Sequence, residues 1–286
     1  MNNISRLFIF LNIIFLLTIS VHGFAQKTSD NKVIVTLSAD LNYALLYDGH
    51  VQVREKSFEG SYLKLKENLG MDSWISVGGT IGMNFSKKNI FEFVYTRHYF
   101  EGTGNLSNPT WFNGALYAAN SKADIHKTVY RGFEWIWKAR IYNTPKTDFY
   151  FRTSIHYERL KFYVDAPVDE NSPMSEIYEG FSRQQLPLPS FGIALNHEIT
   201  QRWSLTAEVF ASYLPTIRTW MQEGGTMYLA QSNVDARLNL LYHFRSLSIC
   251  AGIWFKHYRV KEESREDENV FLLNGIGDKI SVLMDF

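Results

Sequence analysis

The chain has 286 residues, in which 29 lysines and arginines balance 29 aspartates and glutamates. Zero net charge argues against a dedicated nucleic-acid-binding protein, which would carry a basic surface, so we expect no nucleic-acid partner. A single cysteine, Cys250, excludes an intramolecular disulfide framework and a metal site built from several cysteines. Because 45% of the residues are hydrophobic, 15% aromatic and only 20% charged, a mainly disordered chain is excluded as well.

The first 25 residues have the composition of a secretory signal peptide. Arg6 and the amino terminus form a positive start, residues 7–19 are almost entirely apolar, and Gly23 and Ala25 supply the small residues of a cleavage site. The alternative is a transmembrane anchor, but the apolar run is shorter than the roughly 20 residues of a spanning helix and Asn12 interrupts it. We therefore predict that residues 1–25 are cleaved and that residues 26–286 form one domain.

Beyond the signal, apolar and polar residues alternate with a period of two, which is typical of β-strands with one apolar face. Between residues 33 and 47 the odd positions are apolar or aromatic, whereas the even positions from Thr36 to Asn42 are polar. Ten segments behave in this way, at residues 32–47, 73–85, 90–99, 128–142, 148–164, 188–199, 202–213, 233–245, 247–260 and 270–286.

The connections between these segments are alternately short and long. The short ones lie at residues 86–89, 143–147, 200–201 and 246, and the long ones at residues 48–72, 100–127, 165–187, 214–232 and 261–269. Membrane β-barrels have this arrangement, with short periplasmic turns, long extracellular loops and an even number of strands. We therefore predict an all-β fold: a ten-stranded antiparallel transmembrane β-barrel in the outer membrane of a Gram-negative bacterium.

The last segment carries Ile280, Val282, Met284 and the terminal Phe286 on one face. It resembles the C-terminal strand of bacterial outer-membrane proteins, which typically ends in phenylalanine. The resemblance implies recognition of Phe286 by the barrel-insertion machinery. Aromatic residues near strand ends predict girdles at the two lipid–water interfaces, against outer-membrane lipid and lipopolysaccharide. They are Tyr43, Tyr47, Phe91, Tyr99, Trp135, Trp137, Trp203 and Tyr213.

Three stretches resemble a group of uncharacterised bacterial outer-membrane β-barrel proteins of ten-strand size. They are residues 63–71 (LKLKENLGM), residues 93–97 (FVYTR) running into residues 100–102 (FEG), and residues 112–114 (FNG) followed by Tyr117. The likeness extends over nearly the whole mature chain, although its motifs are loose. It implies a location and a fold, and it carries no functional residues over to this chain.

The polar faces of the segments predict a charged barrel interior. A barrel of about eight strands is filled by its own side chains, whereas 16–18 strands leave an aqueous channel. Ten strands with acids and bases of similar number favour a largely plugged lumen, because buried charges need partners. The predicted lumen charge network comprises Glu92, Glu134, Arg152, His156, Glu158, Glu208, Asp235 and Arg237.

Two Asp-x-His pairs are the only candidates for catalysis: Asp48 with His50, and Asp124 with His126. An aspartate that orients a histidine is a reasonable general base. Omptin proteases also have ten strands and use an Asp-Asp pair and an Asp-x-His pair at the barrel rim. This chain has no Asp-x-Asp spacing, so the omptin catalytic residues do not carry over. No sequence pattern indicates a metal site or a cofactor, and we predict neither.

Aromatic residues in the long segments are candidates for contact with an extracellular ligand or for a small core that covers the barrel mouth. They are Trp111, Phe112, Tyr178 and Trp220. The function predicted from the sequence is a structural or surface-interaction role. Two alternatives stay open at this stage: a hydrolase at the rim that uses an Asp-x-His pair, and a narrow solute channel.

Overall fold

The computed structural model describes residues 33–55, 60–85, 88–172, 181–182, 187–220, 226–265 and 267–286. The predicted signal peptide lies outside these residues. Among the described residues, no helix has both the length and the apolar character needed to cross a membrane.

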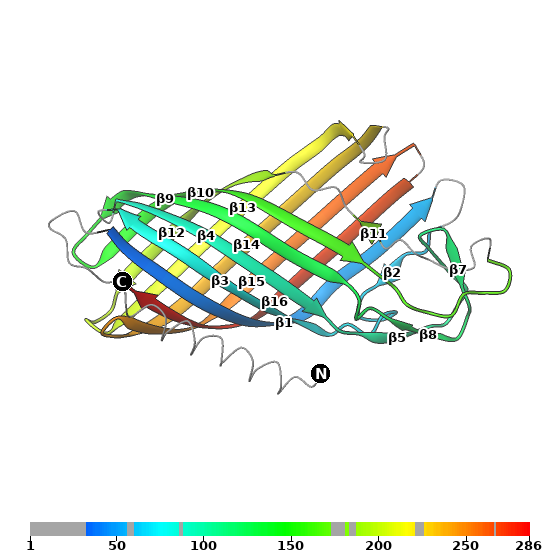
Figure 1. The fold of residues 1–286 in the computed structure, drawn as a ribbon, viewed down its shortest axis with the longest axis horizontal. Helices are drawn as coiled ribbons and strands as arrows, with labels where there is room; N and C mark the ends of the chain where they lie inside the picture. The colour runs from blue at the N-terminus through cyan, green and yellow to red at the C-terminus, as the bar shows by residue number, and fades with distance from the viewer. Residues whose placement is uncertain are drawn as a thin grey trace.

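Ten long strands form the main body (Figure 1). They are β1 (Val33–Glu55), β3 (Ser73–Phe85), β4 (Asn89–Phe100), β9 (Val129–Asn143), β10 (Thr147–Phe162), β12 (Leu188–Glu198), β13 (Trp203–Trp220), β14 (Thr226–Phe244), β15 (Leu247–Ser264) and β16 (Asp267–Asp285). The short strands are β2 (Leu63–Lys64), β5 (Thr103–Leu106), β6 (Thr110–Phe112), β7 (Ala115–Tyr117), β8 (Ser121–Asp124) and β11 (Phe181–Ser182).

The long strands close into a ring in which every neighbouring pair is antiparallel. Each strand pairs with the next along the chain, and β16 returns to pair with β1, from Thr36 opposite Asp285 to Glu55 opposite Asp267. Closure satisfies the backbone groups of every strand, which a membrane-spanning sheet requires. The start of β1, the end of β16 and the four short turns share one end of the barrel, on the left of Figure 1, and this is the periplasmic end.

The outer wall carries the apolar and aromatic residues that the alternation predicted. Trp135 and Tyr213 are 70% and 78% exposed, and the exposed set includes Tyr43, Tyr47, Phe91, Trp137 and Trp203. A closed barrel with this many exposed apolar side chains is stable only where lipid covers them.

Several strands run well past the predicted segments towards the extracellular end. β1 has 23 residues, although roughly 9–11 residues suffice to cross the membrane. The predicted loops 48–72, 214–232 and 261–269 therefore lie partly within strands β1, β13, β14, β15 and β16.

Two bulges explain why the alternation did not reveal the extensions of β1 and β13. Residue 47 is left out of the register between β1 and β16, and residues 215–216 are left out between β13 and β14. A bulge moves the following residues to the opposite face, so the apolar pattern changes phase. Pro215 lies in the second bulge, where its missing N–H costs no ladder hydrogen bond.

The extracellular segments form compact structure over the barrel mouth. β5 pairs with β8, β6 pairs with β7, and β2 adds to the edge of β1. The segment between β2 and β3 touches strand β5 closely: a Cβ on Gly104 would lie 1.9 Å from the carbonyl oxygen of Asn68. Glycine at this position therefore lets the second loop pack directly on the first.

Candidate functional site in the barrel lumen

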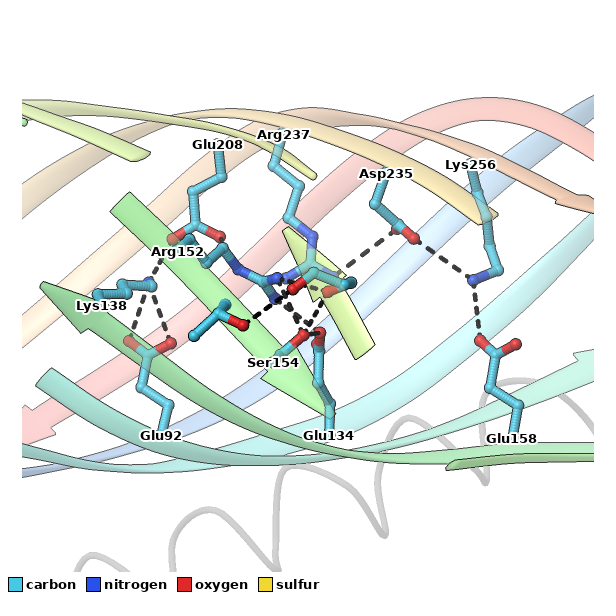
Figure 2. Close-up of polar contacts among 12 residues, drawn as sticks. Glu92, Glu134, Lys138, Arg152, Ser154, Glu158, Glu208, Asp235, Arg237 and Lys256 are labelled. Carbon is cyan, nitrogen blue, oxygen red and sulfur yellow. Dashed lines mark hydrogen bonds and ion pairs between the residues drawn. The ribbon is translucent and has the colours of Figure 1, made fainter. Parts of the chain in front are cut away.

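Inward-facing side chains from eight of the long strands build a network of charges inside the barrel (Figure 2). The strands are β1, β4, β9, β10, β13, β14 and β15, and β16 adds Lys279. These positions alternate with the exposed apolar residues of the outer wall, so the same period-two pattern that fits the barrel to lipid also fills its interior.

Arg152 lies at the centre of the first cluster and is completely buried. Its guanidinium group donates to the Glu134 carboxylate at 2.7 Å and lies 3.9 Å from the Glu208 carboxylate. Its Cζ also lies 3.5 Å above the centre of the Phe210 ring, which is a cation–π contact. The energetic cost of burying this cation is therefore offset by two carboxylates and by the face of an aromatic ring.

The neighbouring carboxylates are compensated in turn. Lys138 binds both Glu208 and Glu92, with 3.0 Å to Glu92. The Ser154 hydroxyl donates to the same Glu134 oxygen that accepts from Arg152, at 2.6 Å. Each ion in this cluster thus has at least one partner of opposite charge, as buried ions require.

A second cluster crosses the barrel towards β15. Lys256 bridges Glu158 at 3.3 Å and Asp235 at 3.6 Å, and Arg237 approaches Asp235 at 3.8 Å. Arg237 also lies 5.1 Å from the centre of the Phe210 ring, so the two clusters meet at that ring. Lys279 of β16 binds Asp40 of β1 at 3.1 Å.

A cavity of about 90 Å³ remains between these groups. It is lined by the second cluster, by Glu134 of the first, and by His98 and His156. Neither ring nitrogen of His156 has a hydrogen-bond partner among the residues that the structure describes, although this histidine is only 4% exposed. The cavity is polar and has room for a few small molecules of the size of water.

Above the charges the lumen changes character and becomes an apolar core. Trp74, Phe100, Tyr130, Trp254 and Tyr258 point inward from the long strands and contact one another through their ring edges and faces. The extracellular segments add Leu65, Leu69, Met71, Leu106, Phe112 and Ile125 to the same core, all of them at most 2% exposed. We call this set the apolar cap.

The apolar cap also explains the small residues of β16. A Cβ on Gly275 would lie 2.0 Å from the Trp74 ring. Any larger residue at this position would displace the tryptophan that covers the charged layer.

All eight residues of the predicted charge network lie in this interior layer. Seven of them form the ion pairs described above, and His156 lines the cavity. Sequence reasoning did not find the apolar cap. A signal was present: Val51, Val53, Val260, Phe271 and Leu273 are apolar on faces that the period-two pattern assigns to the lumen once the bulge in β1 is known.

The first Asp-x-His pair lies within β1, on its outer face. Asp48 accepts a hydrogen bond from the Asn274 amide at 3.1 Å, and the His50 ring packs at a tilt against Tyr62 with 4.4 Å between ring centres. The two side chains have different hydrogen-bond and ring partners.

The second pair does come together, at the start of the loop after β8. The Asp124 carboxylate accepts from the backbone N–H of His126 at 2.8 Å and contacts its Nδ1 at 2.5 Å. Partial burial opposes ionisation of Asp124, but these hydrogen bonds outweigh it and lower the pKa of the carboxyl group. Asp165 forms a backbone bridge beside Asp124, and its carboxylate binds Lys127 at 2.7 Å. The Asp124 carboxylate therefore fixes a turn.

Of the four aromatic residues predicted to contact a ligand, the structure describes three, and they have different positions. Phe112 is 1% exposed and packs against Phe162, so it belongs to the apolar cap and cannot contact a ligand. Trp111 is half-buried, and its backbone pairs with Ser61. Trp220 ends strand β13, and Tyr178 lies outside the described residues. Within the described part of the chain, no group of three or more His, Cys, Asp or Glu side chains is placed to hold a metal ion.

Solved structures of similar fold are bacterial outer-membrane barrels. The outer membrane protease OmpT of Escherichia coli matches with a TM-score of 0.52 and 10% identity over 92% of this chain and 99% of that one. The chain has the outer-membrane β-barrel fold. The translocator domain of the autotransporter NalP of Neisseria meningitidis matches with a TM-score of 0.38 and 10% identity, over 96% of this chain and 95% of that one. No protein-family model matches the chain, and neither does any curated protein.

At this level of identity the likeness concerns the fold alone. The location follows from the fold together with the chain's own outer wall: a closed antiparallel barrel whose apolar belt ends in aromatic residues belongs in the outer membrane. The protein is therefore a bacterial outer-membrane β-barrel protein.

Proposed function

We propose that this protein is a closed outer-membrane barrel that does not conduct solutes and that serves a structural or surface-interaction role. The observation that carries the proposal is the two-layer filling of the lumen. Ion-paired side chains occupy its membrane-embedded part, and the apolar cap covers them on the extracellular side.

The physical argument concerns the cost of a passage. An ion entering from outside would have to cross a packed apolar layer that includes Trp74 and Trp254, which are 2% and 7% exposed. Removing a charge from water into such a layer is costly, and closely packed side chains leave little room for water beside it. The charged side chains below the apolar cap form ion pairs with one another, so a solute would have to break buried ion pairs to pass.

The long strands support the surface-interaction part of the proposal. β1, β13, β14, β15 and β16 extend the barrel beyond its lipid-facing belt and carry the loops away from the membrane. A rigid sheet that positions loops is a common basis for binding an extracellular ligand.

Planar-bilayer conductance of the purified protein tests the closed state, with a general porin as the positive control for insertion. We expect no openings from this protein. Discrete, reproducible openings would overturn the proposal.

A thiol-accessibility experiment tests whether the apolar cap is the barrier. In a Cys250→Ala background, Thr96→Cys places a thiol at the lumen cavity, and Ser107→Cys places one on an exposed loop as the matched control. We expect a membrane-impermeant maleimide to label the first at least about a hundredfold more slowly than the second. Replacing residues 63–71 by a short Gly-Ser turn should remove that protection. Equal labelling with the cap intact would contradict the proposal.

A further inference from the structure

Three arginines form a row across the outer wall of the barrel. Arg97 on β4 pairs directly with Arg131 on β9, and Arg131 pairs directly with Arg159 on β10. Each is flanked along its strand by inward-facing residues, such as His98, Tyr130 and Leu160, so all three side chains point outward. Directly paired residues have Cβ atoms about 5 Å apart, which brings the three guanidinium groups within reach of one ligand.

The positive charge of this row is not compensated within the described residues. None of the ion pairs there involves Arg97, Arg131 or Arg159. The Arg97 guanidinium lies 4.8 Å from the centre of the Tyr99 ring, and Lys161 adds a fourth cation two residues beyond Arg159. Like charges directly opposite each other on a sheet are destabilising, so an anion from outside the described residues would stabilise the row.

Aromatic residues lie immediately below the row, towards the periplasm. The next outward position on the three strands holds Tyr95, Phe133 and Tyr157, and the following one holds Phe93, Trp135 and Ile155. The Tyr95 and Phe133 rings are 5.0 Å apart, and Trp135 is the most exposed residue of the group. The arginines therefore begin where the lipid-facing surface ends.

The height of the row on the barrel agrees with this. Ile141, at the periplasmic end of β9, is apolar and 65% exposed, so it marks the lower edge of the lipid-facing surface. Arg131 lies ten positions away along the same strand. At about 3.3 Å per residue and a strand tilt of about 40°, this is a vertical distance of about 25 Å, the thickness of the apolar band of outer-membrane barrels.

On the opposite wall of the barrel, polar residues begin at a similar height above the periplasmic end. On β15, His257 lies ten residues from Leu247 and faces outward. Its Nδ1 contacts the Asn274 side-chain oxygen at 2.6 Å, and Asn274 in turn donates to Asp48. There the polar surface is hydrogen-bonded within the protein, whereas the arginine row on the other side has no side-chain hydrogen bond of this kind among the described residues.

We propose that Arg97, Arg131 and Arg159 bind the phosphate groups of lipopolysaccharide, the anionic lipid of the outer leaflet. Guanidinium groups bind phosphate through paired, charge-assisted hydrogen bonds, and three of them in register match a doubly charged anion. Acyl chains below the phosphate would lie on the aromatic wall formed by Phe133 and Trp135. This site goes beyond the proposed function and does not depend on whether the lumen is closed.

Binding of fluorescently labelled lipopolysaccharide to the detergent-solubilised protein tests the site. The variant is Arg97→Gln/Arg131→Gln/Arg159→Gln. The matched control, Lys88→Gln/Lys146→Gln/Arg202→Gln, removes the same charge from exposed residues at the periplasmic end. Heat-modifiable migration on gels confirms that both variants are folded. We expect the row variant to bind at least about tenfold more weakly than the wild type, and the control variant to bind like the wild type.

Two competitors distinguish the source of the phosphate. Dephosphorylated lipopolysaccharide should compete at least about tenfold more weakly than the intact lipid, and inorganic phosphate at millimolar concentration should not displace it. Equal binding by the row variant and the wild type would overturn the site. Equal competition by the dephosphorylated lipid, or displacement by free phosphate or by phosphatidylglycerol vesicles, would overturn the assignment to lipopolysaccharide.

Discussion

Replacing Arg152 by methionine is the most direct test of the charged layer. The substitution keeps the apolar stem of the side chain and removes the cation that lies 2.7 Å from Glu134 and above Phe210. Because Arg152 is fully buried and the Glu134 side chain is only 12% exposed, the carboxylate would lose its principal partner without gaining water. Breaking a buried pair in this way costs about 3–5 kcal/mol.

The double variant Arg152→Met/Glu134→Gln separates this reasoning from a loss of packing. With the carboxylate neutralised, the Ser154 hydroxyl still has a side-chain oxygen to donate to, and no uncompensated charge remains at this position. Replacing both members of a buried pair is often close to neutral. We therefore expect the double variant to recover most of the stability that the single variant loses.

The measurement is equilibrium unfolding by urea in lipid vesicles, followed by tryptophan fluorescence. With a slope of about 3 kcal/mol per molar urea, the single variant should unfold at a urea concentration about 1–1.7 M lower than the wild type. A loss below about 1 kcal/mol, or a double variant less stable than the single one, would refute the view that Arg152 compensates a buried carboxylate.

Three further predictions concern the cap and the loops. Gly275→Ala should destabilise the barrel by about 1–3 kcal/mol because its Cβ would overlap the Trp74 ring, and Trp74→Leu in the same chain should restore part of the loss in the same urea assay. Tyr117→Phe removes the hydroxyl that donates to the buried Val164 carbonyl at 2.7 Å, so limited proteolysis should cleave residues 100–127 several-fold faster; an unchanged rate would show that this bond does not hold the loop. The lowered pKa of Asp124 means that the stabilisation it gives the loop is present above the ordinary value of 3.8 and is lost as the pH falls through the folded value. Hydrogen exchange of the His126 amide should therefore show this loss on acidification in the wild type and not in Asp124→Asn, and the same acid response in both would contradict it.

The barrel was predictable because its pattern is repeated. Ten segments of alternating character, separated by alternately short and long connections, have few structural solutions when one face must meet lipid. The same alternation assigned Glu92, Arg152 and Asp235 to the interior, because in a strand every second side chain points the same way.

Two features could not be predicted from the alternation of apolar and polar residues: the bulges in the strands and the contacts between residues that are distant in sequence. The bulge at Tyr47 changes the phase of β1, and a sequence pattern that changes phase cannot be distinguished from a pattern that ends. Whether Asp48 and His50 share a site depends on partners such as Asn274 and Tyr62, which are distant in sequence or lie in a loop.

The sequence by itself determined the strand number, the faces of the strands and the charges of the lumen, since these depend on local periodicity. Only the tertiary structure decided which charges pair, and it alone placed the cap over them, since Trp74 and Trp254 meet across the barrel. The arginine row has the same origin: Arg97, Arg131 and Arg159 are separated by 34 and 28 positions, and strand register alone brings them side by side.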